Sequence, residues 1–351
     1  MSKVASIALR GALPNHLIGH GHGHGHGHGY GPNLADADPS RKSYTQGMDR
    51  RTRDNLAYYI LRGVLAVGSR LPLGLTRKLV PIATRFALRF MKRERGRMQE
   101  NLEIAFPELD ERERKRIMTG CADHLGRVLA EIAWLWRAQP EDVLQMCEVE
   151  GIEHIWNALE SGRGGILATG HLGNWEMLNA YLGAAGVPIT VAVRELDDSR
   201  VDEVVNTLRT RFGSEVILRG TSAGRQLLKA LSIGRGVGLL IDQDIPSIPG
   251  VFVPFFNRLA WTPSGAATLA LRARCPLIPG YIHRKPDGTH KVKIYPPIEV
   301  PTEGSLKEKV VEMTAAAAAA AEWQVRAWPE QWVWMHRRWR TRPEEEVTSE
   351  P

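Results

Sequence analysis

The sequence has few cysteines and lacks a long hydrophobic run. Three cysteines, Cys121, Cys147 and Cys275, are spread over 351 residues, and their spacing matches neither a zinc site nor a disulfide framework. A reducing, cytoplasmic-side location is therefore predicted. No uncharged apolar run reaches the ~18 residues of a transmembrane helix. The N-terminus lacks a compact signal peptide because Arg10 interrupts a short apolar stretch. We expect a protein that is soluble or lies on a membrane surface.

Several common catalytic motifs are also missing. The sequence contains no Gly-x-Ser-x-Gly elbow, no Walker sequence and no His-Glu-x-x-His zinc site. The glycines of residues 234–238 lead into a predicted strand instead of following one, which argues against a dinucleotide fingerprint. No cysteine has a nearby base. We therefore predict a histidine base that activates a substrate hydroxyl directly, with no metal and no bound cofactor.

The composition is that of a globular protein with an excess of positive charge. Apolar residues make up 43% of the chain and charged residues 24%, and the net charge is +7. This charge favours an acidic partner, either an anionic membrane, an acidic carrier protein or nucleic acid. We rank nucleic acid last because it leaves the ordered motifs described below unexplained.

The sequence divides into four predicted regions. Residues 1–50 contain a Gly-His tract between Gly19 and His28 and are predicted to be a disordered extension. Divalent metal binding by its imidazoles is the alternative. Residues 51–140 are predicted to be helical, residues 141–342 to form an α/β domain, and residues 343–351 to be a disordered tail.

The helical region begins with two apolar segments that carry several arginines. Residues 55–69 and 75–91 read as two helices, and the second leads into the basic run at 92–97. An apolar surface bordered by Lys and Arg is typical of a helix in the interface of an anionic bilayer. The alternative is a pair of core helices with a solvated charged face.

From about residue 148 the pattern alternates between short apolar strands and amphipathic helices. This alternation predicts an α/β fold with a mixed, largely parallel sheet flanked by helices. Predicted strands cover residues 165–170, 189–195, 215–219, 236–242, 276–284 and 290–296, and predicted helices cover 174–186, 198–213, 222–234 and 263–274. A final helix is expected through the seven alanines at 315–321.

The stretch ATGHLGNWEML, residues 168–178, places a histidine and a glutamate five residues apart. Inside one helix they would lie roughly 140° apart. We therefore expect His171 in a loop after the strand and Glu176 in the first helical turn, pointing back toward His171. Such a carboxylate would fix the imidazole tautomer and leave the other nitrogen as a general base. The alternative is an ordinary histidine at the start of a helix.

Five ordered segments resemble the lysophospholipid acyltransferase superfamily, in the form used by bacterial lipid A secondary acyltransferases and phosphatidylinositol mannoside acyltransferases. The His-x4-Glu stretch is one, and the resemblance covers roughly residues 55 to 342. The others are NLEIAFPEL (101–109), GLLIDQDIP (238–246), residues 250–284 and PEQWVWMHRRWR (329–340). The resemblance implies a glycerol-3-phosphate acyltransferase-like fold. It also implies transfer of a fatty acyl chain from a thioester to a glycolipid hydroxyl, at the cytoplasmic face of the bacterial inner membrane.

The resemblance also implies roles for individual residues. His171 would be the general base and Glu176 its orienting partner. Substrate-site roles are implied for residues that match other family blocks. These are Asn174, Arg211 (with Arg209 as the alternative register), Asp242, Gly250, Phe255 and Phe256. For the two phenylalanines, core packing is the alternative.

The partners follow from the same resemblance. The donor would be an acyl-acyl carrier protein or acyl-CoA, and the first expectation for the acceptor is a lipid A precursor. Alternatives are a phosphatidylinositol mannoside, an ornithine lipid, a lysophospholipid, or a non-catalytic lipid-binding homologue. Attachment to the membrane would be peripheral or through a single anchor. The Trp/Arg-rich segment at 332–340 suits headgroup contact, or a C-terminal helix packed on the sheet.

Overall fold

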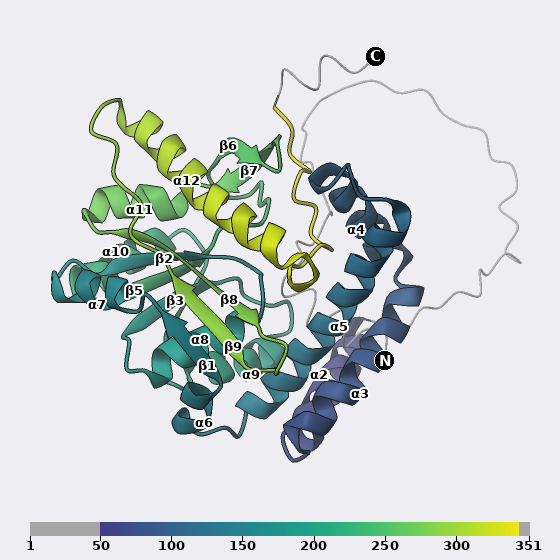
Figure 1. Cartoon of the computed structure of the whole chain (residues 1–351). Coiled ribbons are helices and arrows are strands. Elements are labelled where there is room, and N and C mark those ends of the chain that lie inside the picture. Colours follow the sequence, from purple (N-terminus) through teal and green to yellow (C-terminus); the bar gives the residue numbers. More distant parts are fainter. Residues whose placement is uncertain (1–49, 344–351) are drawn as a thin grey trace, which may run out of the picture.

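The computed structural model describes residues 50–343. The Gly-His tract and the C-terminal tail therefore lie outside the described residues. Figure 1 shows an α/β body with a group of N-terminal helices at one side. These helices are α2 (Arg50–Gly68), α3 (Leu73–Phe90), α4 (Lys92–Ala105) and α5 (Glu111–Leu135). The two predicted N-terminal helices are confirmed as α2 and α3, with a break around Pro72.

Helix α3 packs unusually close to α5. A Cβ atom at Gly126 of α5 would lie 2.6 Å from the Cα of Pro81 in α3, so only glycine fits there. Beside this contact, the Thr84 hydroxyl donates to the Ala122 carbonyl of α5 at 2.8 Å. The close packing seats α3 against the body, and one side of α3 is left facing outward.

A seven-stranded sheet in the order β1-β9-β8-β2-β5-β3-β4 forms the centre of the body. Neighbouring strands run parallel except for the antiparallel pair β8–β9. The bounds are β1 Cys147–Glu150, β2 Gly165–Thr169, β3 Ile189–Val193, β4 Glu215–Leu218, β5 Gly236–Leu240, β8 Leu277–Arg284 and β9 His290–Ile294. The predicted mixed, largely parallel sheet is confirmed.

Helices cover both faces of the sheet (Figure 1). Along β2, Leu167 packs into a cluster with Met177 of α8, while Ile166 and Ala168 pack into a second cluster with α10, α11 and α12. Alternate residues of a strand point to opposite faces, so β2 has core on both sides. The remaining helices are α6 (Pro140–Gln145), α7 (Glu153–Glu160), α8 (Trp175–Ala184), α9 (Ser199–Thr210), α10 (Ala223–Ser232), α11 (Gly265–Ala273) and α12 (Leu306–Ala327).

Several elements were not predicted from the sequence, among them β1, α6 and α7. An antiparallel hairpin, β6 (Gly250–Phe255) and β7 (Arg258–Pro263), stands apart from the main sheet. After α12, the chain forms a short 3-10 helix, η1 (Pro329–Gln331), and then continues without regular helix. The expected tryptophan-rich C-terminal helix is therefore wrong. Its tryptophans Trp332, Trp334 and Trp339 are buried, which also removes them from headgroup contact.

In the part of the chain that is described, no helix has both the length and the apolar character needed to cross a bilayer.

Candidate active site

His171 lies in a short loop between β2 and α8, at the carboxyl end of a central strand. Two neighbouring residues determine where the loop ends and the helix begins. Gly173 has φ +59°, and a Cβ there would overlap the Ile282 carbonyl of β8. Asn174 caps α8, since its side chain accepts from the Met177 N–H at 3.0 Å. His171 is therefore outside the helix and Glu176 is in its first turn, as the sequence predicts.

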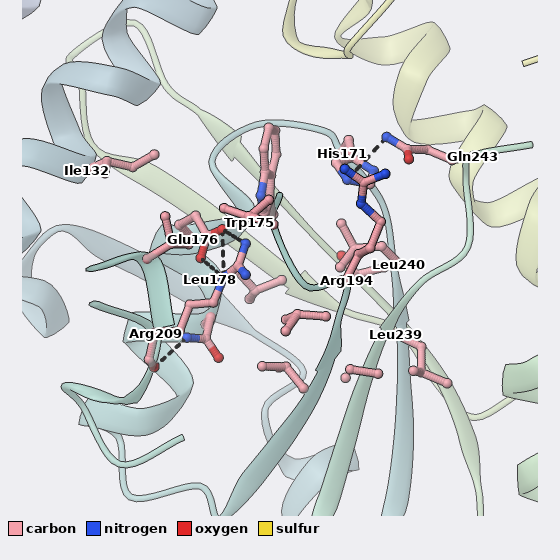
Figure 2. A pocket seen from close by; sticks show the side chains of 18 of the residues that line it. Ile132, His171, Trp175, Glu176, Leu178, Arg194, Arg209, Leu239, Leu240 and Gln243 are labelled. Carbon is pink, nitrogen blue, oxygen red and sulfur yellow. Dashed lines mark hydrogen bonds and ion pairs between the residues drawn. The ribbon is translucent and has the colours of Figure 1, made fainter. Parts of the chain in front are cut away.

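The imidazole of His171 binds Asp242, which follows β5. Its Nδ1–H donates to Asp242 Oδ1 at 2.8 Å, and its backbone N–H donates to Oδ2 at 2.6 Å. The other ring nitrogen, Nε2, accepts from the Gln243 side-chain amide at 3.3 Å (Figure 2). Nδ1 is thus the protonated nitrogen and Nε2 the one with a lone pair, which is the arrangement a general base requires.

Asp242 stays ionised despite its burial. Burial opposes the charged form, but the adjacent His171 and the hydrogen bonds from His171 and Trp332 lower the pKa of Asp242 to about 2. A buried carboxylate with this pKa stabilises positive charge on the imidazole.

His171 lines a cavity of about 1280 Å³. The cavity runs between the N-terminal helices and the carboxyl ends of β2, β3 and β5, and its lining is mostly apolar. The ring of Trp175 meets the His171 ring edge to face at 5.0 Å. The polar side chains in the lining include His171, Glu176, Arg194, Arg209, Arg219 and Gln243. Such a cavity suits a long hydrocarbon chain placed next to a base.

Glu176 does not take the position expected of it. The sequence-based prediction pairs it with His171, but its carboxylate binds Arg209 of α9 at 2.6–3.1 Å. Burial opposes the charged form of Arg209, but Glu176 more than compensates, and the pKa of Arg209 is raised. Within the described residues, Asp242 is the carboxylate that binds His171. In the first turn of α8, Glu176 faces α9 instead of the loop (Figure 2).

Arg211 also differs from its predicted role. Its guanidinium donates to the Ala138 carbonyl at 2.9 Å and lies over Phe212. It is not part of the cavity lining, whereas Arg209 is. Arg209, the alternative in the sequence-based prediction, is therefore the arginine that lines the cavity. Arg211 lies just past the last turn of α9, where it is the C-cap residue.

The other predicted substrate residues have structural positions. Phe255 and Phe256 are 0% and 2% exposed and pack among Phe106 and three tryptophans. Gly250 begins β6, where a Cβ would press on the Trp261 ring. Asn174 is buried at the helix cap. Asn174, Phe255 and Phe256 are buried, and neither they nor the partly exposed Gly250 line the cavity, so direct substrate contact is not supported for these residues.

A buried ionic network lies beneath the His171 loop, and no pattern in the sequence predicted it. The Glu131 carboxylate of α5 binds Arg77 of α3 and Arg284 of β8, with shortest distances of 2.6 Å. It also accepts from the Asn174 amide at 2.8 Å. His124 donates from Nε2 to the Gly173 carbonyl at 2.9 Å. The network ties the His171 loop to three surrounding elements, and its members come from distant parts of the chain.

The arrangement resembles no metal site. Within residues 50–343, no group of three or more His, Cys, Asp or Glu side chains is placed to hold a metal ion.

Comparison with known proteins connects this geometry to a reaction class. Residues 48–341 match the family model described as bacterial lipid A biosynthesis acyltransferase. The chain is 33% identical to the lipid A biosynthesis lauroyltransferase of Escherichia coli (strain K12), over 80% of this chain and 90% of the relative. It is 26% identical to the lipid A biosynthesis palmitoleoyltransferase of the same strain, over 72% and 81%. It is also 28% identical to the phosphatidylinositol mannoside acyltransferase of Mycolicibacterium smegmatis (strain ATCC 700084 / mc(2)155), over 56% and 63%.

Proposed function

Because the chain belongs to the bacterial lipid A biosynthesis acyltransferase family, we propose that it transfers a fatty acyl chain from a thioester to a hydroxyl group of a lipid A precursor. The single observation that carries the proposal at the site is the His171–Asp242 pair beside an apolar cavity of about 1280 Å³. The pair provides a base, and the cavity provides room for an acyl chain.

The proposed reaction is a direct transfer without an acyl-enzyme. The acceptor hydroxyl gives its proton to Nε2 of His171 as its oxygen attacks the thioester carbonyl carbon. The tetrahedral intermediate then collapses, the C–S bond breaks, and the thiolate leaves and takes the proton back from His171. The products are an ester and a free thiol, so His171 ends as it began. The Gln243 amide, which donates to Nε2, must yield this nitrogen to the hydroxyl.

Asp242 supports the imidazolium that forms in this step. Its carboxylate binds Nδ1 and holds the tautomer in which Nε2 has the lone pair. This is the role that the motif spacing assigned to Glu176. Glu176 instead orients Arg209 at the wall of the cavity, so we propose an indirect, supporting role for Glu176.

Arginines at the cavity are proposed to hold the acidic groups of the substrates. Arg194 follows β3 and Arg219 follows β4, and both line the cavity. Partial desolvation and the nearby Arg194 guanidinium lower the pKa of Arg219. Within residues 50–343 neither arginine is paired with a carboxylate. Two neighbouring guanidiniums in the cavity lining suit the phosphates of a lipid A precursor or of an acyl-carrier-protein or coenzyme A donor.

We further propose that the enzyme works peripherally at the cytoplasmic face of the inner membrane. The outward side of α3 exposes Leu79, Ile82, Phe86 and Phe90. The basic side chains of Lys78, Arg85 and Arg89 alternate with these residues along the helix. An apolar stripe with flanking cations binds an anionic bilayer, and α3 also lines the cavity. Substrate chains could thus pass from the lipid surface to His171.

The test is mass spectrometry of envelope lipids from cells that make either the wild-type protein or His171→Ala at matched levels. Loss of one acyl chain from lipid A in the variant is the expected result. His154→Ala is the control, since His154 lies on α7 and outside the cavity. Identical lipid profiles, with His171→Ala folded as judged by circular dichroism, would support the non-catalytic lipid-binding alternative instead.

The second candidate acceptor is a phosphatidylinositol mannoside. The observation in its favour is the similarity to the Mycolicibacterium smegmatis enzyme, which carries that acceptor in its name. Purified protein incubated with an acyl thioester and each glycolipid in turn separates the two candidates. Product from the mannoside alone would overturn the lipid A assignment and leave the reaction type unchanged.

A further inference from the structure

The chain segment after α12 passes directly against the His171 loop. In this C-terminal segment (residues 329–341), Trp332 forms an isolated antiparallel bridge with Leu172. The Val333 N–H donates to the His171 carbonyl at 3.2 Å, and the Gln331 carbonyl accepts from the Gly173 N–H at 2.9 Å. The segment therefore follows the loop on both sides of His171.

Trp332 also reaches the carboxylate that binds the base. Its indole Nε1–H donates to Asp242 Oδ2 at 2.8 Å, across 90 positions of sequence. Oδ2 accepts a second bond from the His171 N–H, and Oδ1 accepts from His171 Nδ1. All three donors come from the loop or from the C-terminal segment, and both Trp332 and Asp242 are buried.

We propose that Trp332 is a positioning residue for acyl transfer, whose indole N–H holds the Asp242 carboxylate in the plane that directs Oδ1 at His171 Nδ1. This inference rests on the proposed function. A carboxylate can turn about its terminal bond, and two donors converging on Oδ2 oppose that rotation. The imidazole then stays in the orientation that aims Nε2 at the acceptor. A catalytic group must be held within about 0.5 Å of its productive position, and its own contacts do not suffice for this.

The packing around Trp332 suits this role. Its ring meets Trp334 at 4.6 Å and Phe255 at 5.9 Å between centroids, and its carbonyl accepts from the Cys121 thiol at 3.2 Å. The indole is thus clamped from several sides. The buried Phe255 contributes by packing against Trp332.

Other tryptophans of the segment lack this connection. Trp334 donates to the Pro329 carbonyl and Trp339 to the Phe255 carbonyl, so both use their indole N–H to satisfy backbone. Trp332 instead donates to Asp242, the carboxylate that binds His171. Trp339, also buried and without a ring contact to Trp332 among the described residues, is a matched control.

The test compares Trp332→Phe with Trp339→Phe in the full-length protein. Each change removes one buried indole N–H and keeps an aromatic ring, so both are expected to lower the melting temperature to a similar extent. For Trp332→Phe, kcat is expected to fall about 10–100-fold, the usual cost of removing a group that orients a functional side chain. KM for donor and acceptor should change less than about twofold, because the cavity is untouched. Trp339→Phe should retain kcat within about twofold.

A double-mutant cycle separates positioning from general packing. In an Asp242→Ala background the indole has no carboxylate to orient, so adding Trp332→Phe should lower kcat no further. A Trp332→Phe loss of the same size in both backgrounds would overturn the inference, as would a kcat equal to that of Trp339→Phe.

The proposed function is tested first and separately, with His171→Ala. If His171→Ala retains full acyl transfer, the proposed function itself fails. If His171→Ala is inactive while Trp332→Phe behaves like Trp339→Phe, only the positioning role fails.

Discussion

The two residues of the His-x4-Glu motif each find a partner outside it. His171 binds Asp242, 71 positions further along the chain, and Glu176 binds Arg209, 33 positions further. The local fold explains why the two residues bind different partners, because the helix cap at Asn174 puts His171 in a loop and Glu176 on a helix. The motif therefore contributes to a hydrogen-bonded pair, His171–Asp242, and to an ion pair, Glu176–Arg209.

Arg209, which lines the cavity, and Arg211, which does not, can be compared directly. Arg209→Ala leaves the largely buried Glu176 carboxylate without its partner, whereas Arg211→Ala removes one hydrogen bond to the Ala138 backbone. We expect Arg209→Ala to lower acyl transfer by about 100-fold, the order of loss that misplacement near the reacting atoms causes. Its free energy of unfolding should fall by on the order of 2 kcal/mol, since Arg209 is partly exposed and solvent screens part of the charge.

Activity assays and urea unfolding of both variants provide the measurement. Arg211→Ala is expected to stay within about twofold of wild-type activity. Equal losses in the two variants would argue against a site role for Arg209.

At the scale of the element, α3 serves two environments. On one side, Arg77 binds Glu131 and Thr84 binds the Ala122 carbonyl of α5. On the other side, apolar side chains face outward. A helix that packs on the protein through one side, and exposes apolar and basic side chains on the other, is suited to lie between a protein body and a lipid surface.

The outward side of α3 predicts membrane binding that depends on particular side chains. Leu75 and Ile82 are 43% and 57% exposed and do not line the cavity. The double variant Leu75→Ser/Ile82→Ser should weaken binding to vesicles containing anionic lipid by about 10–100-fold, since each side chain would bury apolar area in the bilayer. Vesicle flotation measures this directly.

Ile233→Ser is the matched control, because Ile233 is 67% exposed at the end of α10, far along the chain from α3. Its vesicle affinity should match that of the wild type. An unchanged affinity in the α3 variant would refute the proposed orientation on the membrane.

At the scale of the whole molecule, several histidines are buried in neutral form. Burial, the largest cause in each, lowers the pKa of His124, His290 and His336, in the last case to about 3. Because the pKa of each is lowered by folding, these histidines take up protons at a higher pH in the unfolded chain than in the folded one. The unfolded state then binds more protons, so stability falls as the pH falls.

We therefore expect the urea midpoint to drop from pH 7.5 to pH 5.5, with each histidine contributing at most about 1.4 kcal/mol per pH unit. Asp242 contributes only below about pH 4, because its folded pKa of about 2 lies under the ordinary value. His336→Asn keeps an acceptor for the Asp244 N–H that His336 binds, and should show a smaller drop. A midpoint independent of pH across this range would contradict the prediction.

The sequence alone predicted the alternation of strands and helices in the α/β body and the place of His171, the candidate base, within it. Alternation of apolar strands and amphipathic helices predicted the α/β fold, and the spacing of His171 and Glu176 predicted that a loop ends and a helix begins just after His171. These signals are local, because they depend on backbone preferences and on periodicities that a few adjacent residues express. The hairpin β6–β7 and the short elements β1 and α7 were missed.

Only the tertiary structure decided which side chains meet. Residues two positions apart near the end of a helix point roughly 200° apart, so packing decided that Arg209 and not Arg211 reaches Glu176. Asp242 and Trp332 meet because the end of β5 and the C-terminal segment converge on the same loop. Such contacts depend on how distant segments pack, and no local pattern records that. The sequence thus predicted His171 as the candidate base, and the fold supplied the groups that bind its imidazole and Asp242.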